Sequence, residues 1–185
     1  MKLLYIDACA RHDSRTRKLA EHLIGRTDAE VTRVYLYDRT WAATDEKVLK
    51  MRDAAKAAGD YSDAYFDNAK QFAAADEIVI ASPFWDLSFP AVLKAYLETV
   101  CVCGITFRYS PEGIPIGLCR AKKLTYVTTA GGTIYDDSFG YGYVKALALS
   151  LFGIGQIECV KAEGLDIVGA DAEEILRGAM DTLNT

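Results

Sequence analysis

The fold of this chain is decided at residues 3–24, LLYIDACARHDSRTRKLAEHLI, where a short apolar run leads into an amphipathic segment. Residues 3–8 are almost continuously apolar, which is typical of a strand buried on both faces of a sheet. From Ser14 onward, apolar residues recur at spacings of three and four and predict a helix. They are Leu19, Ala20, Leu23 and Ile24. A strand that passes directly into a helix is the repeating unit of parallel α/β sheets.

The same alternation of apolar runs and helical periodicity continues through the chain, with no internal repeat and no low-complexity linker. Four more strands are predicted, at residues 31–37, 77–82, 123–129 and 157–162. Helices are predicted at residues 45–75, where Gly59 divides two of them, and at 90–100, 143–152 and 171–183. We therefore expect one α/β domain, residues 1–185, built as a doubly wound five-stranded parallel sheet with helices on both faces.

The composition of the 185 residues, 51% hydrophobic and 25% charged, is that of an ordinary globular protein. The net charge of −5 argues against a nucleic acid or an anionic membrane surface as the main partner. No apolar run approaches the ~18 residues of a membrane helix, and the N-terminal stretch lacks the features of a signal peptide. We therefore expect a cytoplasmic protein without membrane insertion.

The five cysteines are odd in number and show no framework spacing, so reduced thiols are expected in a cytoplasmic chain. Cys101 and Cys103 are separated by one residue, which is closer than the paired cysteines of most metal sites. The only histidines are His12 and His22. No metal site is therefore expected.

The loop between the first strand and its helix combines groups that bind phosphate. A helix N-terminus offers free backbone N–H groups and the positive end of a dipole. Ser14 and Thr16 add hydroxyl donors, and Arg11 and Arg15 add positive charge. The spacing is neither a Walker P-loop nor a Gly-x-Gly-x-x-Gly turn. The alternative is that Ser14 or Asp13 only caps the helix, but a cap needs no arginines, so a phosphate site is predicted.

Two other loops follow strands at the same edge, where ligands of such sheets bind. Residues 82–90, SPFWDLSFP, offer a proline-stiffened aromatic wall for a flat ring; the alternative is a hydrophobic plug or a dimer surface. Residues 128–133, TTAGGT, permit close backbone approach to a ligand, or they form a plain turn.

Two further segments contain candidate functional residues. An aromatic stretch after the fourth strand predicts either a lid or the edge of the core, and its members are Tyr135, Phe139, Tyr141 and Tyr143. The segment at residues 104–113, GITFRYSPEG, lies in a stretch of about twenty residues with little helical pattern. Long ordered loops in compact domains tend to be functional.

Taken together, these motifs resemble the flavodoxin-like NAD(P)H:quinone oxidoreductases and FMN-dependent azoreductases over nearly the whole chain. The firmest stretch, residues 82–132, joins the aromatic loop, the GITFRY segment, a basic pair, a strand and the glycine pair. The resemblance implies a flavodoxin-like fold with strand order 2-1-3-4-5. It also implies FMN at the carboxyl ends of the strands and NADH or NADPH as the electron donor.

The resemblance implies roles for individual residues as well. The phosphate turn corresponds to Ser14, Arg15 and Thr16, next to Arg11. The loop along the flavin edge corresponds to Pro83, Phe84, Trp85, Asp86 and Leu87, and the second flavin loop to Thr129, Ala130, Gly131 and Gly132. Phe107 and Tyr109 fall where family members place residues over the substrate pocket. Tyr109 or Tyr135 is the candidate catalytic residue that orients a substrate oxygen or supplies a proton.

Three positions depart from the family pattern. Asp86 stands where an asparagine is common, so a side-chain amide donor is lost beside the flavin. Ala130 stands where arginine or glycine is common, and Cys9 where small hydroxyl residues are frequent. These changes bear on substrate and cofactor preference more than on FMN binding.

The implied activity is a ping-pong two-electron reduction, in which NAD(P)H delivers a hydride to the flavin and a quinone, azo compound or similar flat acceptor then takes its place. The resemblance also implies a homodimer with the site at the interface. The alternative is a flavodoxin-type electron carrier, which the modest net charge and the arginines of the phosphate turn disfavour. A phosphoacceptor receiver domain would need an acidic cluster after the first strand, where Asp7 stands alone.

Overall fold

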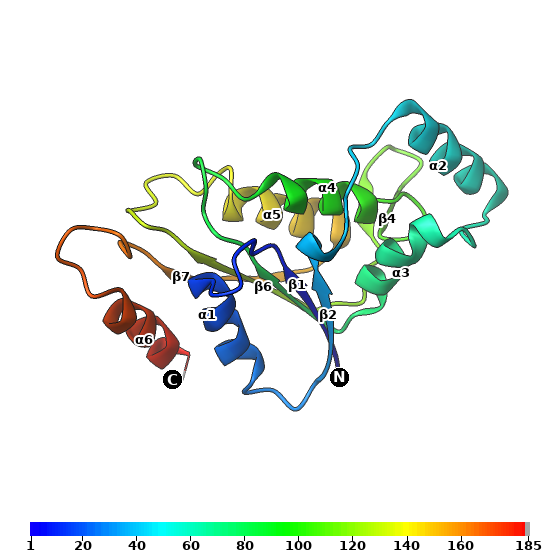
Figure 1. Ribbon diagram of the computed structural model, residues 1–185. Helices are drawn as coiled ribbons and strands as arrows, with labels where there is room; N and C mark the ends of the chain where they lie inside the picture. The colour runs from blue at the N-terminus through cyan, green and yellow to red at the C-terminus, as the bar shows by residue number, and fades with distance from the viewer. Residues whose placement is uncertain (184–185) are drawn as a thin grey trace.

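The computed structural model describes residues 1–183 and is built around a five-stranded parallel sheet (Figure 1). Its strands are β1 (Lys2–Asp7), β2 (Glu30–Tyr35), β3 (Glu77–Ala81), β6 (Lys123–Thr129) and β7 (Gln156–Ala162). They lie in the order β2-β1-β3-β6-β7, and every pairing is parallel. The five strands predicted from the sequence, and their order in the sheet, are confirmed.

Two layers of helices cover the sheet, one on each face (Figure 1). The first layer consists of α1 (Arg15–Ile24) and α6 (Ala172–Thr182). The second consists of α3 (Asp67–Ala74), α4 (Ala91–Val100) and α5 (Tyr141–Leu147), with α2 (Glu46–Ala58) at its periphery. Short helical turns occupy Leu36–Asp38, Ala64–Phe66 and the π-helical Ala148–Phe152. None of the helices described has the length and apolar content of a membrane span.

The side chains of β1 alternate between the two layers and belong to two separate cores. Leu4 and Ile6 are buried on the side of α3, α4 and α5, whereas Leu3 and Tyr5 are buried on the side of α1 and α6. A strand that is covered on both faces has no polar face, which explains its continuous apolar sequence. By the same alternation Asp7, the last residue of β1, faces α1, and it is buried.

Two of the element boundaries that differ from prediction have an identifiable reason. β2 ends at Tyr35 rather than residue 37, because the chain turns at Leu36. Leu36 is nevertheless buried in the core, so it continues the apolar pattern after the backbone has left the sheet. α5 begins at Tyr141 rather than residue 143, since the glycine at 142 conceals the helical pattern.

The segment at residues 103–122 contains a hairpin that the sequence analysis missed. β4 (Phe107–Tyr109) pairs antiparallel with β5 (Pro115–Gly117) in a separate two-stranded sheet. Each strand has only three residues, too few to display the alternation that identifies a strand. The hairpin packs closely on the end of the π-helical turn, because an ideal Cβ on Gly117 would lie 2.2 Å from the backbone nitrogen of Gly153.

Gly117→Ala is expected to lower the free energy of unfolding by about 1–3 kcal/mol, because the new methyl group would overlap the backbone of Phe152 and Gly153. Denaturant titration followed by circular dichroism measures the change. Gly178→Ala in α6 is the control, since within the described residues no atom beyond its chain neighbours and the adjacent helix backbone lies within 4 Å of its ideal Cβ. It should raise stability by about 0.5–1 kcal/mol. Equal stability of Gly117→Ala and wild type would show that the hairpin does not press on the turn.

Candidate functional site

A cavity of about 550 Å³ opens at the carboxyl ends of the parallel strands. Backbone hydrogen bonds hold these ends side by side: the Ala8 N–H donates to the Ala81 carbonyl at 2.8 Å, and the Ser82 N–H donates to the Val127 carbonyl at 2.9 Å. The loops after β1, β3, β6 and β7 all contribute to the lining, together with the first turns of α1 and α6. The lining residues are Ala10, Arg11, Asp13, Ser14, Arg15, Thr16, Lys18, Pro83, Phe84, Trp85, Thr129, Gly131, Asp166 and Glu173.

The cavity brings together residues from the three loops that the sequence analysis singled out. Of the predicted cofactor-binding residues, those that line it are Arg11, Ser14, Arg15, Thr16, Pro83, Phe84, Trp85, Thr129 and Gly131. Asp86, Leu87, Ala130 and Gly132 belong to the same loops but are not part of the lining formed by residues 1–183. Ala130 is buried, and its N–H donates to the Ala162 carbonyl at 3.0 Å, so it holds the second loop against β7.

The N-terminus of α1 faces the cavity with two of its amides available. Ser14 is the N-cap, and its hydroxyl accepts the N–H of Arg17 at 3.3 Å, so the capping alternative is confirmed for Ser14. The backbone N–H groups of Arg15 and Thr16 have no acceptor within the described part of the chain. Free N–H groups at a helix start form a natural anion site. Capping and anion binding are therefore compatible at this helix.

A pair of buried threonines joins the first and third of the cavity-lining loops. The hydroxyl oxygens of Thr16 and Thr129 lie 2.6 Å apart in a buried hydrogen bond. The Thr129 carbonyl also accepts the N–H of Phe84 at 3.0 Å. Thr129 thus connects the start of α1 to the aromatic loop after β3, and the relative position of the three loops is fixed.

The loop after β7 closes one side of the cavity through Arg15. The guanidinium of Arg15 donates to Asp166 Oδ1 at 2.8 Å and to the Leu165 carbonyl at 3.1 Å. An ideal Cβ on Gly131 would lie 2.4 Å from Asp166 Oδ2, so only glycine fits without moving this carboxylate. Sequence analysis missed Asp166 and Glu173, although the rule that function gathers at the carboxyl ends of strands points to the loop after β7.

The aromatic loop after β3 is stiffened by a tight two-residue turn. Trp85 and Ser88 exchange two backbone hydrogen bonds, each 2.8 Å long. Between them, Asp86 and Leu87 adopt the left-handed conformation, with φ of 50° and 65°. Aspartate tolerates this conformation better than most residues, whereas leucine does so only under strain. The turn holds the indole of Trp85 at the cavity wall.

The residues predicted to cover the substrate pocket lie elsewhere in this chain. Phe107 and Tyr109 sit on the β4–β5 hairpin with their rings edge to face at 5.5 Å, and neither lines the cavity formed by the described residues. Tyr135 also lies outside the lining and is 94% exposed. The aromatic stretch after β6 therefore contains both exposed and core-packed side chains. Tyr135 and Phe139 are exposed, whereas Tyr141 and Tyr143 pack at the edge of the core.

The end of β1 carries a buried polar cluster that the sequence analysis did not identify. Asp7 is buried and forms an ion pair with Arg17 of α1. Cys9 is buried beside them, and burial, reinforced by the negative charge of Asp7, raises the pKa of its thiol to about 12. A buried thiol with a raised pKa is protonated at neutral pH and is a poor nucleophile.

Comparison with known proteins agrees with the fold and the cavity. The family model described as "flavodoxin-like fold" matches residues 1–185. The azoreductase from Bacillus anthracis strain Sterne has a similar structure, with a TM-score of 0.84 and 25% identity over 99% of this chain and 96% of that one. The chain thus has the sheet and the ligand-binding edge that define flavodoxin-like proteins.

Sequence relatives narrow this class. The FMN-dependent NADH:quinone oxidoreductase 2 of Clostridium acetobutylicum is 37% identical over 97% of this chain and 94% of that protein. An FMN-dependent NADH:quinone oxidoreductase of Clostridium perfringens is 36% identical over 94% of this chain and 91% of that protein. This chain belongs to the flavodoxin-like family of NADH:quinone oxidoreductases and azoreductases.

Thr16→Val is expected to lower the free energy of unfolding by about 1–3 kcal/mol, because the buried hydroxyl of Thr129 would lose its partner. Thermal or denaturant unfolding measures the loss. The double variant Thr16→Val/Thr129→Val removes both hydroxyls and should recover most of that stability. Strictly additive losses in the two single variants and the double variant would contradict a coupled pair.

Proposed function

We propose that this protein is an FMN-dependent oxidoreductase that transfers two electrons from NADH or NADPH to a flat acceptor such as a quinone or an azo compound. The observation that carries the proposal is the presence, in one cavity, of a helix N-terminus and a stiff aromatic wall. The first suits a phosphate and the second suits a flat ring system. The names of the clostridial relatives and of the Bacillus azoreductase agree with this chemistry.

The phosphate of FMN fits the start of α1. The free amides of Arg15 and Thr16 and the hydroxyl of Ser14 would bind its oxygens, because these groups border the cavity. Arg11 and Lys18 add positive charge at the same end. The guanidinium of Arg15 is held by Asp166, so it would contribute charge and shape more than a free set of donors.

The ring system fits the loops after β3 and β6. Pro83, Phe84 and Trp85 form the apolar wall, and the missing side chain of Gly131 allows close backbone approach. The backbone N–H groups of Gly131 and Gly132, which donate to no carbonyl within the described chain, would stabilise negative charge that develops on the ring. The other members of the loops, which we assign to the flavin site on resemblance, are Asp86, Leu87, Ala130 and Gly132.

The protein's own groups bind and orient, while the cofactor performs the reaction. When bound, FMN would supply the hydride chemistry by which two electrons pass from the nicotinamide to the acceptor that replaces it, in a ping-pong sequence. Both reactants therefore need the same open place against the free face of the bound ring. Trp85 is partly exposed, so it is suited to contact the edge of each reactant in turn.

A homodimer would give Tyr109 access to the reaction. Tyr109 and Phe107 lie outside the cavity of their own chain, so a role over the pocket requires that a second copy bring its hairpin to this site. The loops around the cavity expose apolar side chains suited to such a contact. They are Trp85, Leu87, Tyr135 and Phe139.

A flavodoxin-type electron carrier is the alternative function. Redox carriers use a strongly acidic surface to dock their partner proteins. The lining here is balanced in charge, since Arg11, Arg15 and Lys18 are matched by Asp13, Asp166 and Glu173. The balance favours a small-molecule reductase over a carrier.

The visible absorption spectrum of the purified protein tests the proposal. After incubation with FMN and removal of free flavin, the protein should retain flavin bands that bleach on anaerobic addition of NADH or NADPH. The nucleotide that bleaches them faster is the donor. Bands that resist both nucleotides would favour the carrier, and a colourless protein would contradict FMN binding altogether.

Tyr109→Phe tests whether this hydroxyl orients the acceptor or supplies a proton. Loss of a general acid typically costs 10²–10⁴-fold, so kcat for quinone reduction should fall by roughly 100-fold while the bleaching rate with NADH is retained. Stopped-flow measurement of the two half-reactions separates these effects. Tyr135→Phe is measured in parallel, and the tyrosine whose variant keeps full turnover has no such role. Sedimentation velocity of both variants checks that the oligomeric state is unchanged.

A further inference from the structure

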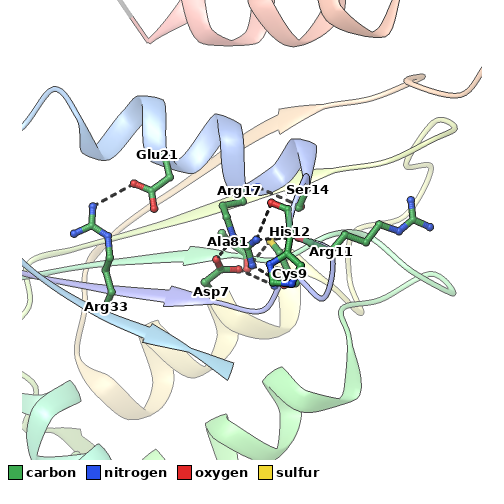
Figure 2. Close-up of polar contacts among 9 residues, drawn as sticks. All are labelled: Asp7, Cys9, Arg11, His12, Ser14, Arg17, Glu21, Arg33 and Ala81. Atoms are coloured by element: carbon green, nitrogen blue, oxygen red, sulfur yellow. Dashed lines mark hydrogen bonds and ion pairs between the residues drawn. The ribbon is translucent and has the colours of Figure 1, made fainter. Parts of the chain in front are cut away.

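A buried ion pair lies beside the loop that joins β1 to α1 (Figure 2). The side chain of Asp7 is 0% exposed, and that of Arg17, in the first turn of α1, is 22% exposed. Arg17 Nε donates to Asp7 Oδ2 at 2.5 Å. A buried charge is unfavourable unless it is paired and hydrogen-bonded, so each of these residues depends on the other.

The same two side chains hold the loop at its start and in its middle. Arg17 Nη1 donates to the carbonyls of Arg11 and His12 at 2.9 and 3.1 Å, and Nη2 donates to the Cys9 carbonyl at 2.8 Å. The second carboxylate oxygen of Asp7 accepts the Cys9 N–H at 2.8 Å. Figure 2 shows the contacts of the Arg17 guanidinium between the strand and the helix.

The donor groups of Arg17 are occupied by bonds within the protein, and its side chain does not line the cavity formed by the described residues. Four of its donor bonds go to Asp7 and to loop carbonyls, and the guanidinium lies 5.9 Å from the ring centre of Tyr35. Burial disfavours its charge, but the hydrogen bond and the negative charge of Asp7 outweigh burial and raise the pKa of Arg17. Arg17 is not among the described residues that line the cavity. Its influence on a ligand is therefore indirect.

We propose that the Asp7–Arg17 ion pair is a positioning device that preforms the phosphate-binding loop, so that the protein selects FMN over riboflavin. The inference rests on the proposed function. Carbonyl oxygens repel an anion, and three of them are turned onto Arg17 instead. The positive charge of Arg17 also neutralises the negative charge of Asp7, which would otherwise repel a phosphate dianion. A loop ordered before binding loses less conformational entropy when the ligand arrives.

Arg17→Met removes the positioning device, and flavin binding to the flavin-free protein measures the effect. Fluorescence titration should give a Kd for FMN about 10- to 100-fold higher than that of wild type. The Kd for riboflavin, which lacks the phosphate, should change by less than about threefold. Amide hydrogen exchange of residues 9–16 in the flavin-free protein should become faster, because the loop has lost its anchor.

Three variants control this experiment. Arg33→Met breaks the exposed ion pair between Arg33 and Glu21 of α1, which lies away from the loop (Figure 2). This variant should change neither the Kd for FMN nor the hydrogen exchange of the loop. Asp7→Asn/Arg17→Met removes both charges of the buried pair, so neither is left unpaired and the variant should fold. Its affinity for FMN should fall as that of the single variant does. Arg17→Lys keeps the positive charge but lacks the forked donors of a guanidinium, so its affinity for FMN should also fall.

Each outcome has a distinct meaning. A wild-type protein that does not bind FMN would overturn the proposed function itself. If wild type binds FMN and the folded Arg17 variants bind it equally well, only the positioning role is wrong. The positioning role would also be wrong if the variants weakened the binding of FMN and of riboflavin equally, because the damage would then be general. It would likewise be wrong if Arg17→Lys kept full affinity for FMN and an unchanged rate of loop hydrogen exchange, because the charge alone would then suffice.

Discussion

The parallel pairing of β1 with β3, and of β3 with β6, is the constraint on which the rest of this structure depends. The register sets Asp7 beside Ala81 and Ala81 beside Val127, so the central strands end at one level and their loops emerge together. A parallel ladder also requires a crossover after each strand, and here each crossover starts at this edge and leads into a helix. The cavity is therefore a product of connectivity, and its side chains decide only what it binds.

Features that depend on neighbours along the chain were predictable from the sequence. The run around Ile78 and Ile80 is apolar because β3 is covered on both faces. Gly59 ends α2 in the left-handed conformation, φ 66°, that its position between two helical patterns predicts. Ser14 and Thr16 were found at a helix start because caps and anion sites follow local rules. Each of these signals arises within a few residues of sequence.

Contacts between distant residues were not predictable in the same way. Arg15 and Asp166 meet although they lie 151 positions apart. Nothing in the local pattern distinguishes Arg17, whose charge is directed onto a buried carboxylate, from the exposed Lys18 beside it. The tyrosine at 109 was assigned by resemblance, and a single chain does not bring it to the cavity. Local sequence thus located the loops of the site but not the bonds that shape them.

The strand order has a further consequence for the protein's behaviour at high concentration. β2 and β7 are the outer strands, and each leaves one side of its backbone without a strand partner in the described chain. Such an edge is a template for fibre growth. Glu30 and Arg33 on β2, and Glu158 and Lys161 on β7, place charges along both edges. Charged side chains along an edge strand disfavour the pairing of copies into one continuous sheet, and both edges of this sheet carry them.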